Sequence, residues 1–348
     1  MNTLSKFINF FAYLFEVYMS TSPFKISKWI MFSGLTLIVG FNLMGYLKYG
    51  KLEISLIYND SPFVTYVALI LIGIGLILSV ISYFTLLFQG RNNVLFYIKG
   101  MSNMNIKAPE DALSGFERSK QHSEEYEVDS YNKNDLKLKY EEIKNDISRR
   151  KGFKNAEKIY IASLGSFPLL FLLGYLTRNS FLKVEILDYN RHSSNGGKWY
   201  KLDKFYFSDV NHEIYNSDLT IKEEIERLKN LENDEVGIAL AYTFNIEKSS
   251  IPSNLQDKTL YLKNSLDIGH DKLSNKDIQK QLLQEISLYM GELSNTKKKI
   301  HLFVSAQASM CVNLGKSYME KTHANIYLYH IDKDTNKQKF YFALDSVK

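Results

Sequence analysis

Two short segments rich in small and polar residues stand where a protein could bind an anion. The first elbow reads Ser163-Leu164-Gly165-Ser166, and the second elbow reads Ser305-Ala306-Gln307-Ala308-Ser309. Each lies between an apolar run typical of a buried strand and one typical of a helix. Small residues let the backbone approach a ligand closely, and the N–H groups at a helix start favour phosphate oxygens. For either elbow alone, the alternative is that small residues merely permit a tight turn.

Three further residues adjoin the elbows. Phe167 follows the first elbow and could stack on a base or pack against its own helix, and Arg191 could pair a phosphate bidentately or be an ordinary loop arginine. Thr243 ends an expected strand and could face the same crevice. The candidate ligand contacts are Ser163, Leu164, Gly165, Ser166, Phe167, Arg191, Thr243, Ser305, Ala306, Gln307 and Ser309.

The motifs of common catalytic sites are missing from the sequence. It contains no GxxxxGK[ST], GxGxxG, GxSxG or HExxH. The single cysteine, Cys311, excludes an intramolecular disulfide and a CxxC zinc site, and the seven histidines are scattered. We therefore expect a binding protein rather than an enzyme, without a cofactor or metal. The net charge of +5 fits a membrane surface or an anionic ligand and is too small to indicate DNA or RNA duplex binding.

The elbows belong to a longer repeat. Lys158–Gly174 and Lys299–Gly315 stand 141 residues apart, and each opens with Lys-Ile and closes with Leu-Gly. Lys198 and Lys339 keep the same offset, each followed by two aromatic residues. A spacing kept over several segments indicates two copies of one βαβ-type unit. Duplicated units of this kind often bind a ligand where the carboxyl ends of their strands meet.

Apolar periodicity predicts the elements that hold the elbows. Strands are expected at 158–163, 182–190, 199–207, 236–245, 258–263, 300–305, 325–331 and 339–344. Helices are expected at 166–177, 220–231, 275–292 and 307–320, the third with Ser274 and Asp277 in the spacing of a capping box. The alternation of strands and helices predicts an α/β fold.

The N-terminal part has a different composition. Residues 29–47 and 61–90 contain no charged side chain, and about 20 apolar residues span a bilayer. We predict a transmembrane hairpin over 29–90, with spans at 29–48 and 64–88. Lysines and arginines on the side of the termini favour cytoplasmic termini. Residues 1–28 are interpreted as an interfacial helix, or equally as an anchor that packs on the hairpin.

Residues 91–149 are interpreted as a linker followed by a helix. The segment 100–134 is polar, and 135–150 carries Leu136, Tyr140, Ile143 and Ile147 on one helical face. The soluble module is then expected over 150–348, with halves of about 150–245 and 246–348.

This module resembles a SAVED domain. The resemblance is carried by IASLGSFPLLFLLGYL and VEILDYNRHSSNGGKWYKLD in the first half, and by IHLFVSAQASMCVNLGKSY, NIYLYHID and FYFALD in the second. SAVED domains are similar to two fused CARF-like, Rossmann-like units. They act as sensors in CBASS anti-phage defence, where an activated nucleotidyltransferase makes a cyclic di- or trinucleotide. An N-terminal transmembrane pair fused to SAVED is a layout found among such effectors.

The resemblance implies a multi-pass protein of the bacterial inner membrane with a cytoplasmic sensor. Ligand would bind between the two CARF-like units and drive homo-oligomerisation. Clustered hairpins would then disrupt the membrane and cause growth arrest or cell death. Two other functions remain open, namely a membrane-anchored sensor that signals to a partner protein, and a membrane-tethered ring nuclease.

Overall fold

A computed structural model describes most of the chain beyond its first third. The described residues are 30–35, 62–88, 93–100, 106, 108–119, 121–129, 132–151, 158–178, 183–190, 197–202, 210–266, 268–269, 272–296, 298–332 and 335–346. The chain divides into two compact units. One comprises Met1–Asn92 with Leu113–Gln121, and the other comprises Asn93–Ala112 with His122–Lys348.

The first unit is dominated by α3 (Pro62–Phe88), a 27-residue helix without a charged side chain. A short helix at 30–35 packs against it, because a Cβ on Gly34 would lie 2.8 Å from the carbonyl oxygen of Ala68. The unit also contains α4 (Gly115–Ser119). The large apolar side chains exposed on α3 are Tyr66, Leu69, Ile70, Ile74, Leu76, Ile77, Val80 and Ile81.

The predicted transmembrane hairpin is not confirmed. Within the described residues, no helix has both the length and the apolar character needed to cross a membrane. On α3, side chains are described only from Tyr66 to Ile81. Most of the predicted span 29–48, and the whole predicted interfacial segment 1–28, lie outside the described residues.

In the second unit, the described strands form two sheets. The first has the order β2-β1-β3-β4-β5. Strands β1, β3 and β4 run parallel to their neighbours, and β5 pairs antiparallel with β4. The elements of this first half are β1 (Asn93–Lys99), η1 (Pro109–Ala112), β2 (Gln121–Glu127), α5 (Lys133–Lys151), β3 (Lys158–Leu164), α6 (Phe167–Thr177), β4 (Lys183–Asn190) and β5 (Lys198–Lys201).

The second sheet has the order β11-β10-β9-β7-β8-β6 over the described residues. Its inner strands β8, β7, β9 and β10 are parallel, and both edge strands are antiparallel to their neighbours. The elements of this second half are β6 (His212–Ile214), α7 (Ile221–Lys229), β7 (Glu235–Ala241), η2 (Lys248–Ser250), η3 (Gln256–Lys258), β8 (Thr259–Asn264), α8 (Lys276–Ser294), β9 (Lys299–Ser305), α9 (Ala308–Ser317), β10 (Ile326–Ile331), β11 (Gln338–Ala343) and η4 (Leu344–Ser346).

The duplication is visible in the order of the elements. β3, α6, β4 and β5 of the first half correspond to β9, α9, β10 and β11 of the second, at the offset of 141 residues. The offset also brings β1 onto β7 and α5 onto α8. The first half therefore begins at β1, whereas the sequence suggested a linker over 91–149 and a domain start near 150. The predicted apolar face of α5 is confirmed, because Leu136, Tyr140, Ile143 and Ile147 are all buried.

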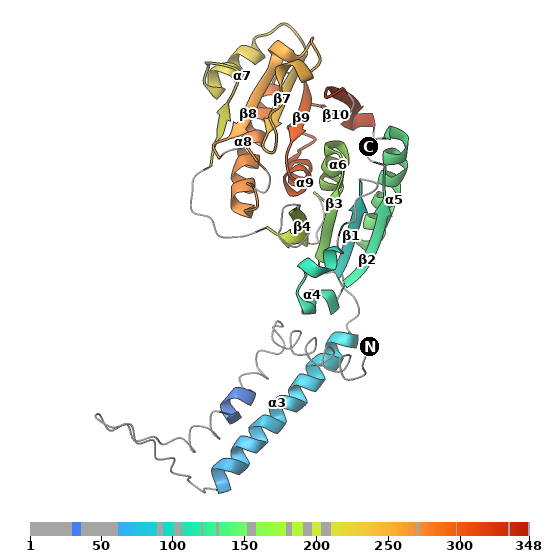
Figure 1. Cartoon of the computed structure of the whole chain (residues 1–348), viewed down its shortest axis with the longest axis vertical. Helices are drawn as coiled ribbons and strands as arrows, with labels where there is room; N and C mark the ends of the chain where they lie inside the picture. Colours follow the sequence, from blue (N-terminus) through green and yellow to red (C-terminus); the bar gives the residue numbers. More distant parts are fainter. Residues whose placement is uncertain are drawn as a thin grey trace, which may run out of the picture. The chain divides into compact units, whose positions relative to one another are not determined.

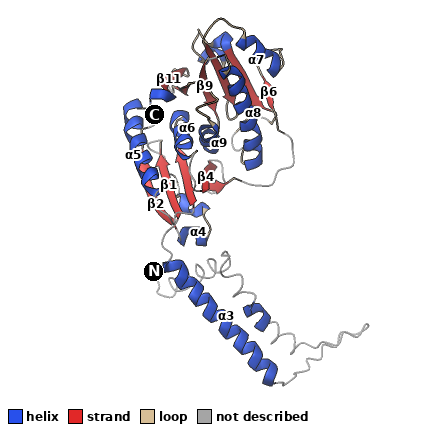
Figure 2. Cartoon of the chain, turned by 180° about the vertical axis from the view of Figure 1, so that it is seen from behind, coloured by secondary structure: helices blue, strands red, loops and turns tan. Residues whose placement is uncertain are grey.

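Helices α6 and α9 lie side by side and join the two halves (Figures 1 and 2). A Cβ on Gly174 would lie 1.8 Å from the carbonyl oxygen of Val312, and one on Gly315 would lie 1.9 Å from that of Phe171. Val312 and Phe171 are themselves 141 residues apart, so the two contacts are reciprocal, as at an interface with two-fold symmetry. The Leu-Gly that closes each repeat is thus the point where the helices touch.

Two helix starts differ from the sequence interpretation. The N-cap of α8 is Asn275, whose Oδ1 accepts hydrogen bonds from the N–H groups of Asp277 and Ile278, so the expected pairing of Ser274 with Asp277 is wrong. A capping box does form at α7, between Thr220 and Glu223. Thr220 accepts from the N–H of Glu223, and the Glu223 carboxylate accepts from the N–H of Thr220.

Candidate ligand-binding site

The first elbow connects β3 to α6. The carbonyl of Leu164 accepts a 2.6 Å hydrogen bond from the N–H of Gly100, which ties the elbow to the end of β1. Ser166 is the N-cap of α6 but makes no capping hydrogen bond with its side chain. Pro168 stands in the first turn and provides no N–H. The start of α6 is therefore a weaker anion site than the sequence suggested.

Two side chains of the first elbow are buried. The hydroxyl of Ser163 is enclosed and has no hydrogen-bond partner. The Phe167 ring is 7% exposed and packs edge-on against Phe171, with centroids 5.8 Å apart. Of the two interpretations of Phe167, packing against its own helix is the one that the geometry supports.

The second elbow connects β9 to α9 and holds two neighbouring loops. The carbonyl of Ser305 accepts hydrogen bonds from the N–H groups of Tyr242 and Thr243, and its Oγ accepts one from Phe244 at 3.0 Å. Gln307 holds Leu273 through both backbone groups, each at 3.1 Å. Thr243 and Ser305 are thus brought together as expected, at the carboxyl ends of neighbouring parallel strands.

A carboxylate of the first half occupies the start of α9. Asp188 on β4 is 2% exposed and accepts hydrogen bonds from Gln307 Nε2 at 2.6 Å and from the N–H of Ser309 at 3.3 Å. It also accepts from the hydroxyl of Ser309. The helix dipole favours an anion at this position. The donors that we expected to bind ligand phosphate are therefore used by Asp188.

The same place in the first half has no such carboxylate. The residue 141 positions after Asp188 is Tyr329, on β10. Gln307 and Ser309 correspond to Ser166 and Pro168. The two elbows are thus equivalent in the fold and different in their chemistry. Arg191, the remaining candidate contact, lies outside the described residues.

A buried polar cluster lies near the end of β7 and was not found from the sequence. His212 Nδ1 is 2.6 Å from Glu285 Oε2, and its Nε2 is 2.6 Å from the hydroxyl of Tyr242. Burial would raise the pKa of Glu285, but the hydrogen bonds from His212 outweigh it and lower that pKa. Burial raises the pKa of Tyr242. The three residues are far apart in the chain, so no local pattern announces the cluster.

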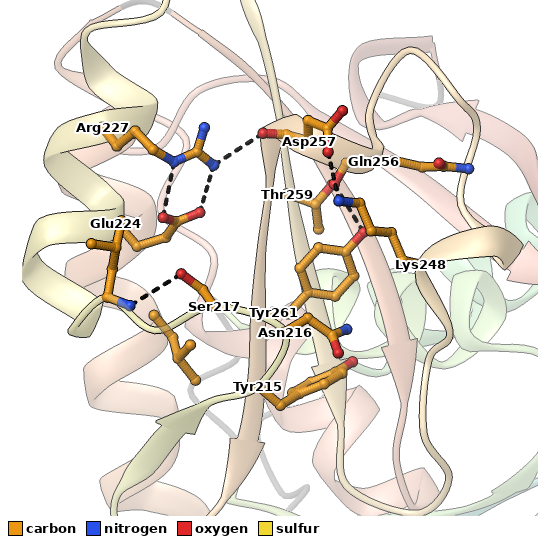
Figure 3. Close-up of a pocket in the computed structure, with 12 residues that line it drawn as sticks. Tyr215, Asn216, Ser217, Glu224, Arg227, Lys248, Gln256, Asp257, Thr259 and Tyr261 are labelled. Atoms are coloured by element: carbon orange, nitrogen blue, oxygen red, sulfur yellow. Dashed lines mark hydrogen bonds and ion pairs between the residues drawn. The ribbon is translucent and has the colours of Figure 1, made fainter.

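A pocket of about 190 Å³ lies at the opposite end of β8 (Figure 3). Its charged groups are paired with one another. Arg227 forms a two-pronged ion pair with Glu224, and Lys248 lies 2.6 Å from Asp257. None of the candidate ligand contacts lines it. It is also smaller than the roughly 300–1,000 Å³ of typical ligand sites.

A comparison with protein families places this geometry. The model of the SAVED family, described as the SMODS-associated and fused to various effectors sensor domain, matches residues 140–345. The chain belongs to the SAVED family. The SAVED match covers nearly all of the second half and the first half from within α5 onward.

Solved structures of Cap4 receptors with SAVED/CARF domains are similar to this SAVED chain. Acinetobacter baumannii Cap4 with the cyclic trinucleotide 3'3'3'-cAAA is 16% identical with a TM-score of 0.45, over 71% of this chain and 51% of that one. Its structure with 2'3'3'-cAAA gives 14% and 0.47, over 81% and 58%. Moraxella osloensis Cap4 gives 15% and 0.43, over 83% and 61%.

The chain thus spans between about half and three fifths of the length of these Cap4 structures. The comparison with curated proteins found no match.

Proposed function

We propose that this SAVED protein is a cyclic-oligonucleotide-gated membrane effector of CBASS anti-phage defence. The observation that carries the sensor part is the SAVED match over 140–345, together with two α/β halves joined through α6 and α9. The Cap4 structures with bound cyclic trinucleotides support a ligand of the same class. The ligand is a cyclic di- or trinucleotide made by a nucleotidyltransferase.

The effector part rests on α3. This helix has 27 residues and no charge, and eight of its large apolar side chains are exposed to solvent in the isolated chain. Exposed apolar surface of this extent marks a membrane or protein contact. We assign α3 to the inner membrane as the second helix of a hairpin, with both termini and the sensor in the cytoplasm. The contact between Gly34 and Ala68 supports a close helix pair there.

Ligand binding drives the sensors to assemble, which clusters the hairpins and disrupts the bilayer. For this to work, the ligand must bind the assembled state more tightly than the separate one. The function is gating rather than catalysis. Lipid, ligand and further copies of the same chain are the partners that this function requires.

The ligand part is tested by equilibrium binding of the full-length protein to cyclic di- and trinucleotides, including 3'3'3'-cAAA. We expect one compound to bind and its linear form not to. Chromatography of the recovered ligand separates a sensor, which returns it intact, from a ring nuclease, which returns it cleaved. Binding without dye leakage from liposomes that carry the protein would favour the anchored sensor.

A further inference from the structure

The second elbow fixes two loops at the carboxyl end of the second sheet. Ser305 binds the consecutive N–H groups of Tyr242, Thr243 and Phe244. Gln307 binds both backbone groups of Leu273. These hydrogen bonds remove much of the freedom of both loops. A side chain presented by either loop can therefore meet a ligand with little loss of conformational entropy.

The first of these loops presents an aromatic ring. Phe244 is 61% exposed, although Tyr242 two residues earlier is only 1% exposed. The ring thus stands outside the core at the end of β7, a central strand of the sheet. Ligands of α/β sheets bind outside the carboxyl ends of the strands.

The second loop presents a cation beside it. The N–H of Gly269 donates to the carbonyl of Tyr242 at 3.0 Å, which joins the two loops. The side chain of Lys272 runs past Gly269, with its Cγ and Cε 3.5 Å from where a Cβ would stand. Lys272 is exposed, and in the described part of the chain no carboxylate forms an ion pair with it.

We propose that Phe244 and Lys272 form the nucleotide contact of the second half. The Phe244 ring stacks on a nucleobase, and the Lys272 ammonium pairs with a phosphodiester oxygen. An aromatic platform beside a cation is the general means of holding single-stranded nucleotides. Ser305 and Gln307 are positioning residues that hold these two side chains, while Asp188 keeps ligand phosphate away from the start of α9. This inference rests on the proposed sensor function.

The test measures the dissociation constant and its salt dependence for the full-length protein, with the cyclic compound that binds best in a panel including 3'3'3'-cAAA. Phe244→Ala should weaken binding by about 10- to 100-fold, and Phe244→Trp should retain it. Lys272→Gln should lower the slope of log affinity against log salt by about 0.7. The matched controls are Leu288→Ala, another exposed apolar side chain (66%), and Lys280→Gln, an exposed lysine on the same helix.

Phe244→Leu separates stacking from loss of apolar area, because it keeps an apolar side chain without a ring. Binding by Phe244→Leu close to that of Phe244→Ala supports stacking. Equal binding by wild type, Phe244→Ala and Leu288→Ala would overturn the inference while the sensor function stands. An unchanged salt slope in Lys272→Gln would overturn the phosphate contact. No binding of any cyclic nucleotide by wild type would overturn the sensor function itself, and this inference with it.

Discussion

The two halves of the sensor share one frame and differ at their elbows. β3–α6 and β9–α9 meet through reciprocal contacts of Gly174 and Gly315. At the elbows the symmetry ends, because Asp188 fills the start of α9, whereas Pro168 stands at the start of α6. The difference indicates that packing has preserved the helix crossing, while ligand contacts were free to diverge. An asymmetric pair of elbows fits an asymmetric set of nucleotide contacts.

Breaking the shared frame should have the largest effect. Gly174→Ala and Gly315→Ala each place a Cβ less than 2 Å from a backbone carbonyl oxygen of the facing helix. The helices must move apart, and we expect a loss of about 3 kcal/mol or more in the free energy of unfolding. Urea denaturation followed by circular dichroism measures it. A similar loss in both variants would show that the crossing is energetically symmetric.

Gly291→Ala on α8 is the matched control for these two variants. A Cβ there would meet nothing within 4 Å, so the helix propensity of alanine should stabilise the protein by up to about 1 kcal/mol. A Gly174→Ala variant as stable as Gly291→Ala would contradict the close helix contact.

Removing the charge that distinguishes the second elbow should have the next largest effect. Asp188→Asn keeps the size of the side chain but replaces an acceptor of three hydrogen bonds with a group that also donates. We expect a loss of about 2 kcal/mol of stability, measured by urea denaturation. The exposed Asp257→Asn serves as the control. Equal stability of the two variants would show that Asp188 does not hold the halves together.

The halves should also differ in their response to acid. His301 occupies the place of Tyr160 in the first half. Burial lowers the pKa of His301 to about 4, from 6.5 when unfolded. As the pH falls below 6.5, the unfolded chain takes up this proton first, so stability should decrease until about pH 4. We expect about 1.5 kcal/mol from this residue. Urea midpoints of wild type and His301→Phe across this range measure it, and equal slopes would count against the account.

The smallest effect should come from α7, an addition to the second half. Thr220→Ala removes the capping box at its start and should cost about 1 kcal/mol. The midpoint of thermal unfolding measures this change. Ser217→Ala, in the turn before the helix, is the control, and an equal shift in both variants would show that the box contributes little.

Much of the fold could be predicted because its signals are local. Continuous apolar runs such as 158–164 and 299–305 predict buried parallel strands, and both form as expected. β1 was missed, although NVLFYIK is equally apolar, because it stands between the uncharged α3 and a polar segment. The repeat was first recognised at Lys158, and the correspondence of α5 with α8 depends on shape rather than on residue identity.

The candidate site was predicted only in outline. The elbows are visible as small residues between apolar runs. Their occupant is not, because Asp188 is about 120 residues from Gln307 and Ser309 and carries no local signal. The anchoring of Phe244 by Ser305 is long-range in the same way. Tertiary contacts thus decide which elbow donors remain available to a ligand.

The most direct test of the proposed gating is dye leakage from liposomes that carry the full-length protein, with cyclic di- and trinucleotides added in turn. The account predicts leakage with one cyclic compound and none with its linear form. Ile77→Lys, a charge on the exposed face of α3, should abolish leakage without changing ligand affinity. Tight ligand binding without leakage from wild type, or undiminished leakage from Ile77→Lys, would contradict a membrane effector built on α3.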